Sequence, residues 1–172
     1  MLLLLRVDDR LLHGQVGTAW TPKLQANFIV IANDKASSNA MLKMTIGLAK
    51  PAGVDLKILP LKQAEEFLCS ADGAASKNRF FVITESIADA AYLTKHVNNL
   101  DKVNLGGIRQ NTEHNKVQIS RQVFLNAEEM KTLAEMEGRG VQIVEQVGPL
   151  DSQKNWHSIQ ESFVKGGGEK CW

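Results

Sequence analysis

The sequence contains little of what marks several specialised protein classes. Only two of its 172 residues are cysteines, Cys69 and Cys171, and their wide separation indicates neither a disulfide framework nor a paired-cysteine metal site. The 20 basic and 19 acidic residues leave a net charge of +1, which disfavours binding to nucleic acid or to anionic lipid. No apolar run approaches the roughly 20 residues that a membrane-spanning helix requires. These absences favour a globular protein of a reducing cytoplasm.

What the chain does contain fits a single domain. Hydrophobic residues make up 44% and charged residues 23% of the sequence, and a chain of this length can bury a substantial core. We expect one domain over residues 1–164, followed by a flexible, glycine-rich tail at 165–172. The four leucines at 2–5 are too few for a signal peptide, and charged residues follow them at once, so they predict a buried strand.

Short apolar runs alternate with segments of helical spacing along the chain. This alternation predicts an α/β fold with a single open, mainly parallel sheet of six or seven strands and helices on both faces. The expected strands are 2–7, 27–32, 54–59, 79–84, 102–105, 122–125 and 141–144, and the expected helices are 15–24, 38–49, 61–69, 87–97 and 127–137. Within 38–49, Met41, Met44 and Leu48 recur at helical spacing, which is typical of residues that face a core.

The turn after the first strand carries the strongest chemical signal. In an open α/β sheet, ligands bind beyond the carboxyl ends of the strands and often at helix N-termini. This turn lacks the glycine patterns of dinucleotide-binding and P-loop proteins, but it holds His13 immediately before an expected helix. A helix N-terminus disfavours imidazolium, and a neutral imidazole has a free lone pair that can attack phosphorus. The backbone N–H groups that could then hold the phosphate belong to Gly14, Gln15 and Val16.

Charged residues surround this histidine in the sequence. Arg6 and Arg10 are candidates to bind phosphate oxygens and to offset negative charge in a transfer transition state. Asp9, or its neighbour Asp8, could orient a ring nitrogen or hold an arginine, and we assign the orienting role to Asp9. The alternative is that His13 only caps or packs the helix and that the charged residues form exposed ion pairs. From the residues alone, both interpretations stay open.

Residues 6–16, with the sequence RVDDRLLHGQV, closely resemble the opening motif of a known family. It comprises the enzyme IIB components of the mannose/fructose/sorbose branch of the bacterial sugar phosphotransferase system (PTS), with the pattern R-[IV]-D-[DN]-R-L-[IVL]-H-G-Q-V. The resemblance implies that His13 receives a phosphoryl group on Nδ1 from enzyme IIA and that the group then passes to a sugar. It continues at 32–34 and 103–107, where Asp34, Gly106 and Gly107 are expected at the active-site edge. The two glycines would leave room for a phosphate or a partner backbone, or only permit a tight turn.

The same resemblance implies the cellular setting. The chain would be a cytoplasmic protein-phosphohistidine–sugar phosphotransferase, peripherally associated with membrane components IIC and IID. We expect no cofactor and no metal, because the histidines share no metal-ligand spacing and the arginines and the helix dipole supply positive charge. The chain could form a homo-oligomer. The sequence HGQVG at 13–17, followed by Trp20, resembles the N-acetylgalactosamine branch, although sugar choice is expected to belong mainly to the membrane components. Asn115 departs from the family by replacing the glycine of a G-K-x-Q hairpin pattern.

Two other functions are weighed against this one. A flavodoxin-like regulatory or binding module could keep the fold without chemistry, but the complete motif around His13 argues against it. A histidine phosphatase would need an arginine where Leu12 stands and a second histidine in a matching context, which the sequence does not offer. A phosphorylation assay separates the non-catalytic module from the phosphocarrier.

Overall fold

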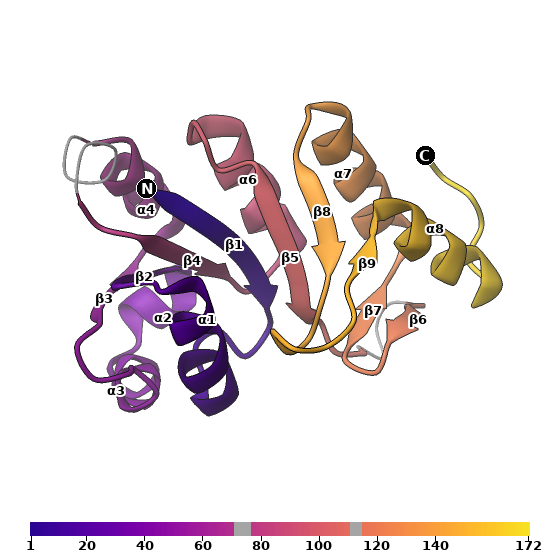
Figure 1. The fold of residues 1–172 in the computed structure, drawn as a ribbon. Coiled ribbons are helices and arrows are strands. Elements are labelled where there is room, and N and C mark those ends of the chain that lie inside the picture. Colours follow the sequence, from indigo (N-terminus) through magenta and orange to yellow (C-terminus); the bar gives the residue numbers. More distant parts are fainter. Residues whose placement is uncertain (71–76, 111–114) are drawn as a thin grey trace.

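A seven-stranded, mostly parallel sheet runs through the centre of the molecule (Figure 1). The computed structural model describes residues 1–70, 77–110 and 115–172. The strand order is β3-β2-β4-β1-β5-β8-β9, in which β9 alone runs antiparallel to its neighbour. These strands are β1 (Leu2–Asp8), β2 (Phe28–Ala32), β3 (Asp55–Leu59), β4 (Phe80–Thr84), β5 (Lys102–Gly107), β8 (Gln142–Glu145) and β9 (Lys154–Asn155). The first strand of the chain therefore lies in the middle of the sheet, between β4 and β5.

Helices cover both faces of this sheet, as the alternation predicts. One face carries the larger core and the helices α4 (Leu61–Cys69), α6 (Ile87–His96), α7 (Ala127–Gly138) and α8 (Trp156–Lys165). The other face carries a smaller core, the π-helix η1 (Val16–Trp20), and the helices α1 (Thr21–Leu24), α2 (Asp34–Ser38) and α3 (Ala40–Leu48). In the part of the chain that the structure describes, no helix is long and apolar enough to cross a membrane.

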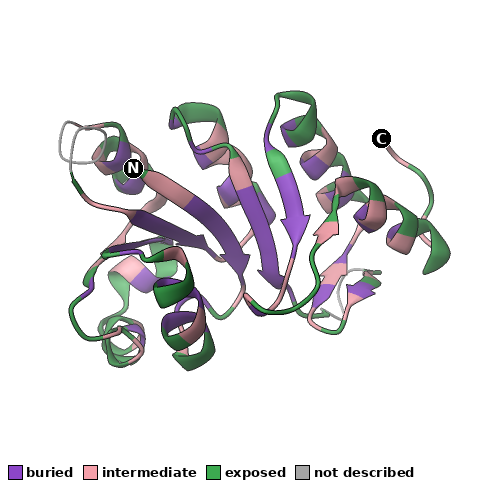
Figure 2. Ribbon diagram, viewed as in Figure 1, coloured by how far each residue is buried: buried purple, intermediate pink, exposed green. Residues whose placement is uncertain are grey.

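The central strand β1 shows how side-chain alternation builds both a core and a site. Successive side chains of a strand point to opposite faces, so Leu5 and Val7 enter the larger core while Leu4 enters the smaller one. Arg6 and Asp8 share the face of Leu4, and both are buried. The carboxyl end of β1 is accordingly purple in Figure 2. The strand thus carries two charged side chains into the interior at its carboxyl end.

Most of the expected elements are present, with boundaries that differ by one or two residues. The helix expected at 38–49 is α3, and the short α2 before it was not expected. Asn39 separates the two, because its extended backbone ends α2 and its side chain caps α3. The helix expected at 15–24 is composite, because η1 precedes α1. The strand expected at 122–125 was wrongly assigned to the main sheet. It is β7 (Val123–Leu125), which pairs with β6 (Val117–Ser120) because a tight turn at 121–122 makes an antiparallel hairpin.

The C-terminal helix α8 was not expected from the sequence. The Asn155 side chain caps its first turn, and Ile159 and Phe163, one turn apart, reach the larger core. Residues 166–172, most of the expected flexible tail, follow this helix. The Trp172 ring lies with its centre 6.2 Å from that of Trp156 and 6.1 Å from that of Phe163.

Candidate functional site

The turn after β1 is held in place by two buried leucines. Leu11 has a left-handed φ of 57°, which is uncommon for a residue other than glycine, and its N–H donates to the Asp8 carbonyl at 2.8 Å. Leu11 and Leu12 both pack in the smaller core. The carbonyl of His13 then accepts a helical hydrogen bond from the Gly17 N–H at 2.9 Å. The two leucines thereby fix His13 at the start of a helix, beyond the carboxyl end of β1.

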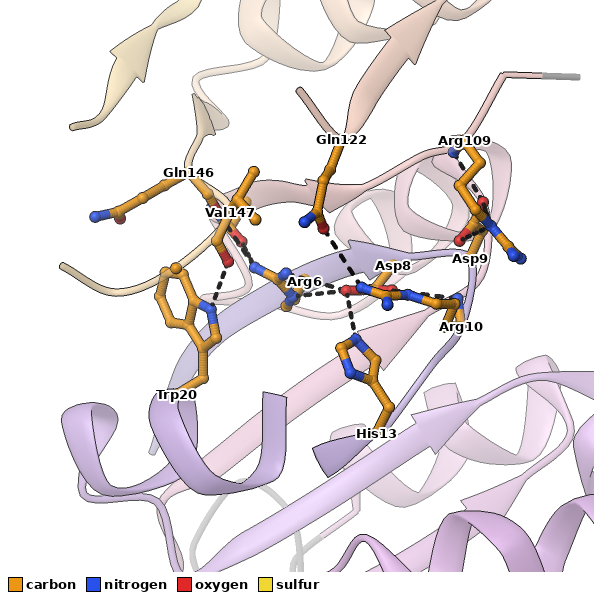
Figure 3. Close-up of polar contacts among 12 residues, drawn as sticks. Arg6, Asp8, Asp9, Arg10, His13, Trp20, Arg109, Gln122, Gln146 and Val147 are labelled. Atoms are coloured by element: carbon orange, nitrogen blue, oxygen red, sulfur yellow. Dashed lines mark hydrogen bonds and ion pairs between the residues drawn. The ribbon is translucent and has the colours of Figure 1, made fainter. Parts of the chain in front are cut away.

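A buried carboxylate contacts the histidine ring (Figure 3). Nε2 of His13 lies 3.3 Å from Oδ2 of Asp8, which is fully buried, whereas the His13 side chain is 21% exposed. Burial by itself raises the pKa of Asp8, but the hydrogen bond from His13 and the charge of Arg6 outweigh it, and the pKa is lowered below 3.8. Asp8 is therefore an ionised group that engages Nε2. Nδ1 is the ring nitrogen that Asp8 does not engage.

The structure brings Asp8, and not Asp9, to the histidine ring. Asp9 accepts from the backbone N–H of Arg109 at 2.8 Å and from its Nε at 3.0 Å. The assignment of the orienting contact to Asp9 is thus corrected, because neighbouring side chains at the end of a strand point to opposite sides. Arg109 was missed by sequence reasoning, although it lies two residues after Gly107, which we expected at the active-site edge.

Arg6, which we expected to bind phosphate, is enclosed in the protein. Its Nη2 lies 3.0 Å from Oδ2 of Asp8, and its Nη1 donates to Oδ1 of Asn104 at 2.6 Å and to the carbonyl of Gln146 at 3.2 Å. The guanidinium also lies 5.1 Å from the centre of the Trp20 ring. Burial lowers the pKa of Arg6, and the charge of Asp8 offsets this only in part. The side chain supports Asp8 from inside the fold.

Gly106 and Gly107 lie beside β1, at the same sheet edge as His13. Asp8 pairs with Gly107 in the parallel register, and the Asp9 N–H donates to the Gly107 carbonyl at 2.8 Å. A Cβ on Gly106 would overlap the Arg6 guanidinium, and one on Gly107 would lie 2.9 Å from Oδ1 of Asp8. Both glycines lie at the sheet edge where His13 lies, and the space that they leave is filled by the protein's own Arg6 and Asp8.

Arg10 lies at the surface beside this buried network. Its Nε is 3.7 Å from Oδ1 of Asp8, and its Nη2 donates to Oε1 of Gln122 at 3.4 Å. In the first turn of a helix, the backbone N–H groups have no carbonyl further back in the helix to bind. The Gly17 N–H donates to the His13 carbonyl, so the N–H groups that precede Gly17 lie in this first turn. They belong to Gly14 and Gln15, which are exposed, and to Val16, whose side chain is buried.

His13 opens onto a cleft of about 640 Å³. The cleft is lined by residues of the 9–14 turn, by one side of α3, and by Asn33, Lys35, Glu85 and Arg109. Asp34, expected at this edge, does follow β2 there, but its carboxylate accepts from the Leu61 N–H at the start of α4. Across the described ranges, no three His, Cys, Asp or Glu side chains are grouped as a metal site would require.

The family model of the PTS system sorbose subfamily IIB component matches residues 2–166. The chain belongs to this family. The match confirms the resemblance seen in residues 6–16. The chain is therefore a phosphotransferase-type component of a sugar PTS. The match also sets aside the histidine phosphatase and the non-catalytic module.

Individual relatives agree with the family. A probable phosphotransferase enzyme IIB component of Streptococcus pyogenes serotype M6 is 37% identical over 79% of this chain and 84% of its own length. The sorbose-specific EIIB component of Lacticaseibacillus casei is 28% identical over 96% of this chain and 99% of its own. The N-acetylgalactosamine-specific IIB component 1 of Escherichia coli K12 is 27% identical over 89% and 94%. The similar identities to the last two do not select one sugar.

Solved structures share the architecture of this IIB component. The N-acetylgalactosamine-specific IIB component 1 of Escherichia coli superposes with a TM-score of 0.82 at 25% identity, covering 90% of this chain and 99% of the other. The IIB domain of the sorbose permease of Klebsiella pneumoniae superposes with a TM-score of 0.85 at 24% identity, covering 94% and 97%. The predicted α/β fold is therefore confirmed.

Proposed function

We propose that His13 is the phosphoryl acceptor of this IIB component. The observation that carries this proposal is the contact between Nε2 of His13 and the buried, ionised Asp8, at the start of a helix and at the edge of an open cleft. A carboxylate on one ring nitrogen fixes the tautomer and leaves the other nitrogen with a lone pair. His13 is thereby prepared to act as a nucleophile through Nδ1.

The proposed reaction has two steps at phosphorus. The lone pair of His13 Nδ1 attacks the phosphorus atom of a phosphohistidine on enzyme IIA. A new P–N bond forms to His13 while the donor's P–N bond breaks, and the donor imidazole is the leaving group. A sugar hydroxyl oxygen then attacks the phosphorus on His13, so a P–O bond forms, the P–Nδ1 bond breaks, and the hydroxyl proton passes to solvent. The chain is in this sense a protein-phosphohistidine–sugar phosphotransferase.

The residues around His13 supply positioning and positive charge. Phosphoryl transfer is catalysed mainly by alignment and by groups that stabilise the charge on the phosphoryl oxygens. The exposed Arg10 and Arg109 border the cleft, and the N–H groups of the first helical turn are natural anion donors. Arg6 acts differently: it is a positioning residue, because its contact with Asp8 holds the carboxylate against the ring.

The proposed partners are an enzyme IIA as donor and membrane components IIC and IID, with which this chain would associate at the cytoplasmic membrane surface. A mannose-specific relative in Escherichia coli K12 is named an EIIAB component, and this chain covers 42% of its length at 23% identity. That name joins an A and a B part, which supports direct transfer between them. We propose that the sugar is selected by the membrane components.

A labelling experiment tests the acceptor. Incubation with phosphoenolpyruvate, enzyme I, the histidine phosphocarrier protein and a cognate enzyme IIA should label the wild type with an acid-labile, base-stable phosphate, as expected of a phosphoramidate. His13→Ala should accept no label. His157→Ala is the matched control, because His157 is an exposed histidine on α8, and it should label normally. Normal labelling of His13→Ala would contradict the proposal, as would attachment at Nε2 by NMR.

A further inference from the structure

The outer side of α3 is apolar and uncovered. Met41, Met44 and Leu48 are 77%, 71% and 84% exposed, so the prediction that they face a core was wrong. Ile46 is the buried residue of this helix and packs in the smaller core. At about 100° per residue, Met44 and Leu48 lie about 160° around the helix from Ile46. The spacing of these three residues correctly predicts a helix, but they lie on the solvent-facing side of that helix.

This apolar stripe, defined as Met41, Met44 and Leu48, is continuous with the cleft of His13. Leu48 lines the cleft itself, together with Leu42 and Thr45 of the same helix. A protein that delivers a phosphoryl group to Nδ1 must bring its own histidine to the opposite side of the phosphorus, within a few ångströms of His13. Its surface around that histidine must then cover the cleft rim and α3.

The far side of His13 is basic instead of apolar. Arg10, Arg109 and Arg121 border a second cavity of about 190 Å³ on that side. The acidic residue of this lining, Asp9, is paired with Arg109, so Arg10 and Arg121 leave the cavity with an excess of positive charge. In a chain with a net charge of only +1, this concentration of cations is local.

We propose that the apolar stripe on α3, with the arginines across the cleft, is the docking surface for the phosphoryl donor. The donor surface that fits it presents apolar side chains on one side of its phosphohistidine and acidic side chains on the other. The charge of the phosphohistidine itself adds to this complementarity. Exposed methionines suit such a surface, because their flexible side chains repack against a partner that must be bound and released. The inference rests on the proposed role of His13.

The test separates docking from chemistry by using two phosphoryl donors. In a triple variant, Met41→Gln, Met44→Gln and Leu48→Gln, the side-chain length and helix propensity are kept while the apolar surface is lost. The KM for phospho-enzyme IIA should rise about tenfold, with kcat nearly unchanged. Phosphorylation by phosphoramidate, a small donor that needs no docking surface, should proceed at the wild-type rate. Val164→Gln is the control, since Val164 is an exposed apolar residue on α8.

Each other outcome overturns the inference in a recognisable way. An unchanged KM for phospho-enzyme IIA, with normal labelling by phosphoramidate, refutes the docking surface and leaves the role of His13 intact. Failure of both donors to label His13 in the wild type refutes the proposed function and the surface with it. A wild-type dimer that the triple variant dissociates would assign the stripe to a second copy of this chain. Loss of transfer to the membrane components alone would assign it to the acceptor.

Discussion

Two buried carboxyl groups at the carboxyl ends of strands in one sheet behave in opposite ways. Asp8 ends β1 and Glu145 ends β8, and they are 0% and 3% exposed. Burial raises the pKa of both groups, and for Glu145 this effect prevails, so its pKa lies above 4.5. For Asp8 the pKa is lowered instead. Equal burial therefore does not decide the charge of a carboxyl group in this protein.

The difference comes from the partners that each group contacts. Asp8 has the Arg6 guanidinium at 3.0 Å and the His13 ring at 3.3 Å. Glu145 accepts from the Ser120 hydroxyl at 2.6 Å, and cations offset its burial only in part. A neutral donor stabilises a carboxylate less than a guanidinium in contact does. Of these two carboxyl groups, Asp8 is therefore the one that stays ionised, and it does so in contact with the His13 ring.

Removing the guanidinium should shift Asp8 towards the behaviour of Glu145 and leave the hydrogen bond from His13 as the main interaction that lowers its pKa. Arg6→Met leaves a buried charge without its partner, which costs about 3–5 kcal/mol of unfolding free energy, and raises the pKa of Asp8. Urea unfolding at neutral pH measures the loss. Arg109→Met is the control, since it breaks the exposed pair with Asp9 and should cost at most about 1 kcal/mol. Equal losses in the two variants would show that the buried pair has no special role.

A methyl group on β5 should displace the same guanidinium without removing it. Gly106→Ala places a Cβ where the Arg6 guanidinium lies, so we expect a loss of about 1–3 kcal/mol and slower phosphorylation of His13. Thermal unfolding and the labelling rate measure the two effects. Gly138→Ala, at the end of α7, meets no atom within 4 Å and should lower neither. A stable, fully active Gly106→Ala variant would mean that Arg6 can move without disturbing Asp8.

Much of this arrangement is predictable from the sequence, and the failures have physical reasons. Uninterrupted apolar runs predict the parallel strands, and the motif around His13 predicts the candidate site. The first strand was expected at 2–7, whereas β1 ends at Asp8. In the longer strand, side-chain alternation places Asp8 on the same face as Arg6, which favours Asp8 over Asp9 as the partner of the ring. The position of Arg109 beside Asp9 depends on the path of the chain after β5, which no local sequence pattern indicates. The outward stripe of α3 was missed because helical spacing alone does not show which side faces the core.

A second arginine beside Asp8 should affect transfer more than stability. Arg10 is 3.7 Å from Asp8 but exposed, so Arg10→Ala should slow phosphoryl transfer at least about tenfold, equivalent to about 1.4 kcal/mol, and leave the thermal midpoint nearly unchanged. Arg10→Lys should rescue the rate only in part, because lysine cannot form a two-pronged contact with phosphate. A parallel loss of stability and rate would identify Arg10 as a structural ion pair.

The smallest expected effect is on the pH dependence of stability, where the two carboxyl groups have opposite signs. Because the pKa of Glu145 is raised on folding, the folded state binds more protons than the unfolded state, and stability falls as the pH rises above 4.5 towards the folded pKa. Glu145→Gln keeps an acceptor for Ser120 and should remove this fall. Asp8 acts oppositely: its contribution is present above 3.8 and is lost as the pH drops through the lowered folded pKa.

Urea unfolding of the wild type, Glu145→Gln and Asp8→Asn over a pH series separates these two contributions. Relative to the wild type, Glu145→Gln should gain stability as the pH rises above 4.5 and match it in strong acid. Asp8→Asn should be less stable than the wild type at neutral pH. The difference should shrink as the pH drops from 3.8 towards the lowered folded pKa, because the unfolded carboxyl group binds a proton there before the folded one does. If both variants changed with pH in the same direction, burial would govern both groups, and the contrast between Asp8 and Glu145 would fail.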